Sequence, residues 1–186
     1  MNWFVKMSKK RQDKMLFHND WLSLKEKDGK YVYSHEERCN GHMVAVLGWR
    51  SKEQSLEILG RYEVCPAHDD GLKLCSLTGG IDKNNGDWEK LALEFAEKEL
   101  KEESGITIPK KKFKSLGIVR PTKSTDTYVH LFSVELMNEE PLSEPEGDGS
   151  EGEKGSYCKW VSYDEAVNCK DPLLHSMMLR LKKEEK

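Results

Sequence analysis

The sequence lacks the segments that direct a chain into or across a membrane. No apolar run approaches the roughly 18 residues that a membrane-spanning helix needs, and the apolar stretch near the N-terminus is too short for a secretory signal. The five cysteines are odd in number and scattered, without the Cys-x-x-Cys pair typical of a zinc site or a redox dithiol. We therefore expect free thiols and a cytoplasmic location.

The chain also lacks an excess of charge of one sign. Charged residues make up 34% of the sequence and hydrophobic residues 37%, and the formal net charge is -3. Both signs are interspersed, which is typical of a soluble protein without a basic face and argues against nucleic acid as the main partner. A length of 186 residues is within the usual range for one compact domain.

What the chain does have is a series of short apolar runs separated by turn signals, which predicts strands. Residues 87–103 place apolar side chains near helical spacing, and the glycine of Ser104–Gly105 suits the left-handed end of a helix. Residues 164–166 and 173–181 predict one short and one longer closing helix. The predicted strands are residues 21–26, 30–34, 42–49, 55–64, 72–77, 113–119, 127–136 and 157–162.

The order of these elements, mostly antiparallel strands with a central and a C-terminal helix, predicts one mixed α/β domain over residues 21–186. Residues 1–20 are expected to be a solvated lead-in. Residues 21–38 predict a leading β-hairpin around the turn signal of residues 27–29. Residues 138–155 are acidic, rich in Gly and Pro, and nearly without large apolar groups, so we expect a mobile loop there.

Three carboxylates gather at the end of the predicted central helix. Glu99 lies one turn before both Glu102 and Glu103, so the three project toward one region. Such a cluster repels itself unless it holds a cation, and Mg²⁺ or Mn²⁺ takes oxygen ligands and leaves positions open for phosphate oxygens. An ordinary solvated helix has similar spacing. The Gly79–Gly80 pair favours the metal interpretation, because backbone there can approach a metal or phosphate without an intervening side chain.

With these residues the sequence resembles the Nudix hydrolase family, whose signature ends in Arg-Glu-apolar-x-Glu-Glu-x-Gly-apolar. Glu99, Glu102, Glu103 and Gly105 stand where that pattern requires them. The resemblance implies an α/β/α sandwich with a mixed sheet, in which a metal-activated water attacks one phosphorus of a diphosphate bridge. It assigns Mg²⁺ or Mn²⁺ to the three carboxylates and to Gly79.

Two positions depart from the signature. Lys98 stands in place of the Arg, which keeps the positive charge but loses the planar fork that orients a carboxylate. Lys90 stands at the place of the first signature Glu. We still count Lys98 with the catalytic carboxylates. The departures motivate an alternative, a catalytically weak Nudix-like sensor that binds a nucleotide to regulate a partner. A phosphate-binding protein unrelated to the family is a third possibility.

Beyond the signature, the chain is similar to the ADP-ribose and ADP-sugar pyrophosphatase branch of the family. This resemblance implies AMP and a sugar phosphate as products, and a homodimer. It gives the aromatic residues of the leading hairpin a role in stacking on adenine, although strand aromatics are more often core. Pro121 matches the position of a proline in that branch, but also suits an ordinary loop. The substrate-binding candidates are Trp21, Tyr33, Arg38, Arg61, Gly80, Arg120 and Pro121.

Two further points affect the substrate and the general base. Glu63 stands where the branch has a phosphate-binding Arg, so either Arg61 or Arg120 compensates or the substrate is another nucleotide sugar, a dinucleotide or a nucleotide-capped RNA end. For the general base we favour Glu153 over Glu151, both in the acidic loop. The alternative is that this loop is only a solvated acidic linker.

Overall fold

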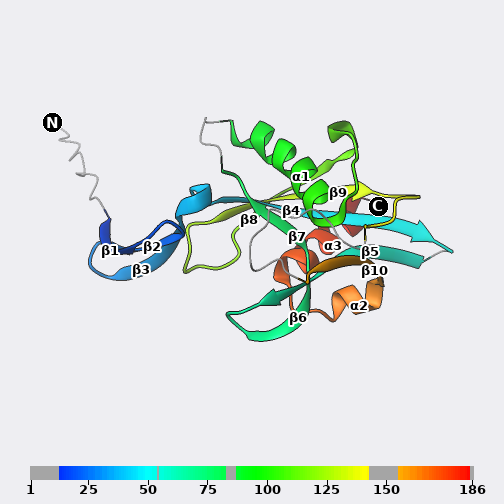
Figure 1. The fold of residues 1–186 in the computed structure, drawn as a ribbon. Coiled ribbons are helices and arrows are strands. Elements are labelled where there is room, and N and C mark those ends of the chain that lie inside the picture. The colour runs from blue at the N-terminus through cyan, green and yellow to red at the C-terminus, as the bar shows by residue number, and fades with distance from the viewer. Residues whose placement is uncertain (1–12, 54, 83–86, 143–154, 185–186) are drawn as a thin grey trace.

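The computed structural model describes residues 13–53, 55–82, 87–142 and 155–184, and Figure 1 shows the path of the chain. No helix in these ranges is long and apolar enough to cross a membrane. The elements are β1 (Lys14–His18), β2 (Leu22–Lys27), β3 (Tyr31–Glu36), η1 (Glu37–Cys39), β4 (His42–Lys52), β5 (Ser55–Cys65), β6 (Asp69–Cys75), β7 (Leu77–Gly80), α1 (Trp88–Ser104), η2 (Lys110–Lys112), β8 (Lys114–Val119), β9 (Tyr128–Glu135), β10 (Tyr157–Ser162), α2 (Tyr163–Val167) and α3 (Pro172–Glu184).

Seven strands form a mixed sheet with helices on both faces. The strand order is β10-β5-β4-β9-β8, with β6 paired to β5 and β7 paired to β4, and β4 runs parallel to β9. Central strand β4 alternates between the two faces: Val44 and Val46 pack in the core under α1, while Ala45 and Leu47 pack in the core under α2 and α3. The predicted α/β/α sandwich with a mixed sheet is therefore confirmed (Figure 1).

Helix α1 forms within one residue of its predicted bounds because its ends carry strong capping residues. The side chain of Asp87 accepts a hydrogen bond from the backbone N–H of Lys90, which satisfies one free donor of the first turn. At the other end Gly105 has φ 73°, and its N–H donates to the carbonyl of Lys101. Phe95, among other apolar side chains on one face, anchors the helix to the sheet.

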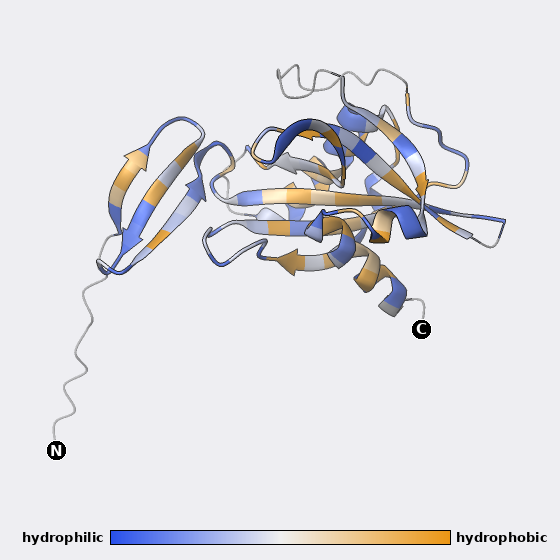
Figure 2. Ribbon diagram, turned by 90° about the horizontal axis from the view of Figure 1, so that it is seen from below, coloured by the Kyte–Doolittle hydropathy of each residue, from blue (hydrophilic) through white to orange (hydrophobic). Residues whose placement is uncertain are grey.

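A separate three-stranded antiparallel sheet, in the order β1-β2-β3, lies at one end of the large sheet (Figures 1 and 2). The hairpin predicted at residues 21–38 is confirmed as β2 and β3. Strand β1 was not predicted, because residues 14–18 fell in the expected lead-in. Every β1 side chain is exposed, so this strand is held mainly by its backbone pairing with β2 and leaves little burial pattern in the sequence.

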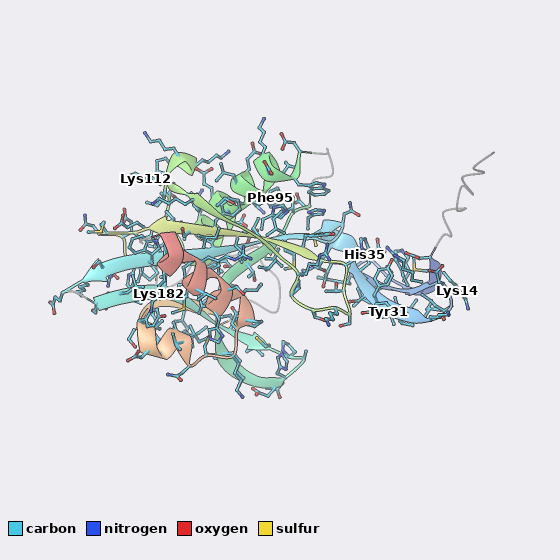
Figure 3. The ribbon with its side chains drawn as sticks, turned by 180° about the vertical axis from the view of Figure 1, so that it is seen from behind. Lys14, Tyr31, His35, Phe95, Lys112 and Lys182 are labelled. Atoms are coloured by element: carbon cyan, nitrogen blue, oxygen red, sulfur yellow. The ribbon has the colours of Figure 1, made fainter. Side chains whose placement is uncertain are left out.

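The small sheet is attached to the large one through the loop of residues 120–126. Ser34 in β3 exchanges backbone hydrogen bonds with that loop, and the side chain of His35 lies 3.0 Å from the Asp126 carboxylate. The hydroxyl of Tyr31 donates to a backbone carbonyl of the same loop. Figure 3 shows His35 at the junction and Tyr31 farther out on the small sheet. The loop thus fixes the position of the small sheet.

The strand predicted at residues 72–77 divides into two strands at Ser76. Its backbone N–H and its hydroxyl both donate to Asp171 Oδ2 at 2.6 Å, which removes this residue from the ladder. The chain before it pairs with β5 as β6, and the chain after it pairs with β4 as β7. Gly79 and Gly80, expected in a link after the strand, are themselves part of β7.

Candidate functional site

A cavity of about 430 Å³ lies beside the C-terminal half of α1, between that helix, β7, β5 and η1. It contains the three signature carboxylates Glu99, Glu102 and Glu103, which we call the glutamate cluster. Residues from five separate elements meet here, so the fold brings together residues that the sequence spreads over more than 60 positions. The predicted site residues that line the cavity are Arg38, Arg61, Gly79, Gly80, Lys98, Glu99, Glu102 and Glu103.

Glu103 is held by partners on both of its oxygens. Its Oε1 lies 2.8 Å from Nη1 of Arg61, and its Oε2 accepts the backbone N–H of Thr78 at 3.1 Å. Arg61 also donates from Nε to Glu63 Oε2 at 2.9 Å, and its side chain is only 4% exposed. The planar guanidinium that Lys98 lacks is thus provided from β5, where it orients two carboxylates at once.

Glu99 fits only because residue 79 is glycine. A Cβ placed on Gly79 would lie 2.0 Å from the carboxyl carbon of Glu99, a distance that no pair of non-bonded atoms can adopt. The carboxylate therefore rests directly against the backbone of β7, and its residue is 9% exposed. The glycine pair was predicted to let a metal or phosphate approach the backbone, and in the structure the side chain of Glu99 occupies the space beside Gly79.

Glu102 lies on the more exposed side of the cluster and pairs with Lys98. The two charged groups are 3.2 Å apart, one helical turn from each other. Partial burial lowers the pKa of Lys98, but the hydrogen bond and charge of Glu102, with further negative charge from Glu99 and Asp82, outweigh it, so the pKa is raised. Lys98 is therefore a fixed positive charge at the cavity wall.

The donor set at this cavity fits a hard divalent cation. Carboxylate oxygens dominate, Asp82 adds one more acid, and the side-chain-free backbone of Gly79 leaves room beside the glutamate cluster. Among the residues that the structure describes, the oxygens of the glutamate cluster do not all lie within 4.8 Å of one another. Arg61 and Lys98 balance part of the negative charge of the cluster.

The aromatic candidates of the leading hairpin do not line this cavity. Trp21 is 60% exposed, with the guanidinium of Arg38 over its ring at 5.1 Å. Tyr33 donates its hydroxyl to Asp13 at 2.5 Å, and this hydrogen bond, with burial second, raises the pKa of Tyr33 to about 12. Arg38 is the one residue of this group that reaches the cavity.

The remaining predictions fall on a loop and on a segment outside the described residues. Arg120 donates to the hydroxyl of Tyr128 at 3.2 Å, and with Pro121 it belongs to the loop that holds the small sheet. Neither residue lines the cavity. Glu153 and Glu151 lie outside the described residues, so the base assignment stays a prediction.

Six lining residues were not among the predicted site residues: Cys39, Met43, Glu63, Val64, Thr78 and Asp82. Asp82 had a readable signal, because it is an acid two residues after the glycine pair. Thr78 acts through its backbone N–H, and any residue would supply that group, so the sequence carries no sign of it.

A partly buried histidine, His42, and a buried one, His130, lie at the other end of α1. The ring of His42 stacks on Trp88, with 3.7 Å between ring centroids and 3° between planes, and its Nδ1 is 3.2 Å from Nε2 of His130. Burial lowers the pKa of both imidazoles, with the neighbouring His42 lowering that of His130 further and Asp126 opposing the shift at His42. Both rings are therefore held neutral near pH 7.

Solved structures share this architecture over most of the chain. The NUDIX domain of Shewanella oneidensis NrtR complexed with ADP ribose superposes with a TM-score of 0.57 at 11% identity, covering 78% of this chain and 88% of that one. The fold is that of a Nudix domain. An ADP compounds hydrolase gives a TM-score of 0.57 at 16% identity, over 93% of this chain and 94% of that one.

A third match is a chain from the complex between the C-terminal domain of mouse MUTYH and human PCNA, with a TM-score of 0.53 at 13% identity over 77% of this chain and 88% of that one. No protein-family model matches the sequence. No curated protein matches it either. At these identities the Nudix likeness is one of fold, so activity has to be argued from the cavity itself.

Proposed function

We propose that this chain is a metal-dependent Nudix-type hydrolase that cleaves a nucleoside diphosphate linked to another group. The substrate is ADP-ribose or an ADP-sugar, and the products are AMP and a sugar phosphate. The observation that carries the proposal is the meeting of the glutamate cluster, two glycines and three cationic side chains in one cavity. One solved structure with this fold is a complex with ADP ribose, and another is an ADP compounds hydrolase, which supports the choice of substrate.

Each group at the cavity has a role that follows from its position. The glutamate cluster and the Gly79 backbone would hold Mg²⁺ or Mn²⁺, which supplies charge neutralisation and a lowered pKa of bound water. Arg61 fixes Glu103, and the N–H of Thr78 fixes its second oxygen. Arg38 and Lys98 offer positive charge to the diphosphate from the cavity wall. Glu153 remains the proposed general base.

Turnover with product identification tests the proposal. Purified protein with Mg²⁺ should release AMP and ribose phosphate from ADP-ribose, measured by mass within a panel of nucleotide sugars, dinucleotides and nucleotide-capped RNA. Glu99→Gln should lower turnover by at least about 100-fold, the scale of losing one preorganised charge at a reacting centre. Glu97→Gln, on the same helix but paired with Lys110 outside the cavity, is the control. Equal rates in both variants would refute the site.

Metal dependence is a second test of the same proposal. Chelation should abolish hydrolysis, and Mg²⁺ or Mn²⁺ should restore it, because carboxylate oxygens prefer hard cations. The chelated protein should remain folded by circular dichroism, since Arg61 and Lys98 already balance part of the charge of the cluster. Full activity after chelation would exclude a metal-dependent reaction.

A nucleotide sensor is the second candidate, and one observation favours it. Glu103 and Glu102 already form ion pairs with Arg61 and Lys98. A nucleotide phosphate would therefore compete with these two carboxylates for the two cations. A sensor should bind ADP-ribose in calorimetry with no AMP released during long incubation with Mg²⁺. Release of AMP that depends on Glu99 would decide for the enzyme.

We also propose a homodimer, which the Nudix resemblance implies. The small sheet supports it, because β1 and β2 expose apolar side chains that one chain leaves uncovered, among them Phe17 at 50% and Leu24 at 37%. Sedimentation should give twice the chain mass, and Phe17→Ser should shift the protein to monomer. A parent protein that sediments as a monomer at all concentrations would end this part of the proposal.

A further inference from the structure

Two cysteines and a carboxylate meet on one face of the β5–β6 hairpin. Glu63 and Cys65 are two residues apart on β5, and Cys75 on the paired strand β6 lies opposite Arg61, the neighbour of Glu63 on the same face. Their ligand atoms, one carboxylate oxygen and two Sγ atoms, all lie within 4.8 Å of one another. The two Sγ atoms are 3.7 Å apart. This cluster was not predicted, because the two cysteines are brought together by the pairing of β5 with β6 and do not form a short sequence motif.

The separation of the sulfurs fits a shared metal ion. Two thiolates on one tetrahedral Zn²⁺, each about 2.3 Å from the metal, are about 3.8 Å from each other. A disulfide requires about 2.05 Å, so the sulfurs would have to move together by more than 1.5 Å. A carboxylate oxygen within reach of both sulfurs supplies a third ligand of a type that zinc also accepts.

The charges around the sulfurs favour a cation. The carboxylate of Glu63 places negative charge beside the Cys75 sulfur. Asp171 adds further negative charge on the same thiol. A divalent ion that replaces the two thiol protons, which pass to solvent, would leave two thiolates and a carboxylate balanced by the metal.

Solvent can reach the two sulfurs through a cavity that shares no lining residue with the cavity of the glutamate cluster. A cavity of about 740 Å³ opens between the hairpin and the start of α3, and Cys65 and Cys75 line it together with His68 and Asp171. A metal held by three protein ligands keeps a fourth position for water or an added ligand. The opening provides both the entry path and the space for that fourth ligand.

We propose that Glu63, Cys65 and Cys75 form a binding site for a thiophilic divalent ion of the Zn²⁺ class, separate from the glutamate cluster. Soft thiolates select Zn²⁺ over Mg²⁺, so the two sites discriminate between the two metals. Glu63 also lines the cavity of the glutamate cluster and accepts a hydrogen bond from Arg61. Because Arg61 also pairs with Glu103, this one side chain connects the two sites.

Cobalt substitution tests the site in the full-length, reduced and chelator-treated protein. With Mg²⁺ in excess to occupy the glutamate cluster, the near-ultraviolet thiolate-to-metal absorption band should saturate at one equivalent of Co²⁺, and Zn²⁺ should displace it. Cys65→Ser and Cys75→Ser should each lose the band and weaken binding by at least about 100-fold, as expected for loss of one thiolate ligand. Cys158→Ser, which removes a buried thiol elsewhere, should keep the band.

A second measurement guards against variants that simply fold badly. Glu63→Gln keeps both thiols, so the band should persist while affinity falls by about 10-fold, the lower end for a perturbed metal shell. Zn²⁺ should raise the midpoint of thermal unfolding of the parent and of Cys158→Ser, but not of Cys75→Ser. Cobalt binding without a thiolate band, equal binding by Cys75→Ser, or a Cys65–Cys75 disulfide that persists in reductant would overturn the proposal. None of these outcomes depends on hydrolysis, so they are independent of the proposed function.

Discussion

The large and the small sheet of this protein are held in different ways. The seven-stranded sheet is covered on both faces, and its central residues from Val44 to Leu47 are fully buried. The small sheet exposes Met15, Phe17 and Trp21, and its attachment to the rest is a set of hydrogen bonds to one loop. Figure 2 shows hydrophobic segments along the strands of both sheets, and no helix covers the small one. Site residues carried by the large sheet meet in a cavity, whereas the aromatic candidates of the small sheet do not.

The largest effect should come from closing the space under Glu99. Gly79→Ala puts a methyl group where the Glu99 carboxylate now lies, and displacing a catalytic group by about 1 Å costs roughly 100-fold in rate. Steady-state hydrolysis of ADP-ribose should fall by at least that factor. Gly71→Ala, whose added Cβ meets only the mobile ends of two surface side chains, should keep the parent rate.

The next prediction compares the stability contributed by a buried ion pair with that of a more exposed ion pair. Arg61→Met leaves the buried Glu103 without its cation and should lower the free energy of unfolding by about 3 kcal/mol. Lys25→Met removes the 3.9 Å pair with Glu37 in the small sheet and should cost at most about 0.5 kcal/mol. Urea denaturation with an unchanged m-value measures both. Similar costs would mean that the small sheet is packed as firmly as the large one.

Low pH should lower the free energy of unfolding because of the pair formed by His42 and His130. Because the folded-state pKa of both His42 and His130 is lowered by burial, the folded protein binds fewer protons than the unfolded chain. Their contribution to stability is present above the unfolded-state pKa of about 6.5 and is lost as the pH falls through the lower folded values. His130→Asn should flatten this part of the profile of unfolding free energy against pH. An identical slope in the variant would assign the acid effect to other groups.

The smallest effect on stability is expected for Trp21→Ala. The side chain is 60% exposed, so the free energy of unfolding should change by less than about 0.5 kcal/mol. If the small sheet contributes to nucleotide binding as the resemblance implies, KM for ADP-ribose should rise while kcat stays constant. An unchanged KM would leave adenine stacking on Trp21 without support.

Features that depend on residues close together in the sequence were predicted well. The bounds of α1 follow from the spacing of Leu91, Phe95 and Leu100, and its C-terminal cap was predicted at Gly105. The hairpin β2–β3 and the two closing helices were found for the same reason. The glutamate cluster is also local, since its members share one helix end. Periodicity and capping act over a few residues, and one sequence is enough to recognise them.

Features that depend on distant pairing were not predictable. Arg61 was predicted to contact the substrate, but its ion pair with Glu103, a residue from another element, was not predicted. The division of residues 72–77 at Ser76 depends on Asp171. The meeting of Cys65 with Cys75 depends on the register of β5 and β6. Each of these contacts is set by the sheet as a whole, and no local pattern reports it.

The hydrogen bonds between Ser76 and Asp171 bear on the order in which the cavity is completed during synthesis. The partner of Ser76 is made 95 positions later, after both central strands and α1 have left the ribosome. A nascent chain that stops before Asp171 therefore contains every member of the glutamate cluster while the start of β7 is still unanchored. Thr78, which holds Glu103, lies two residues beyond that anchor, so the cavity wall is among the last parts of the molecule to become rigid.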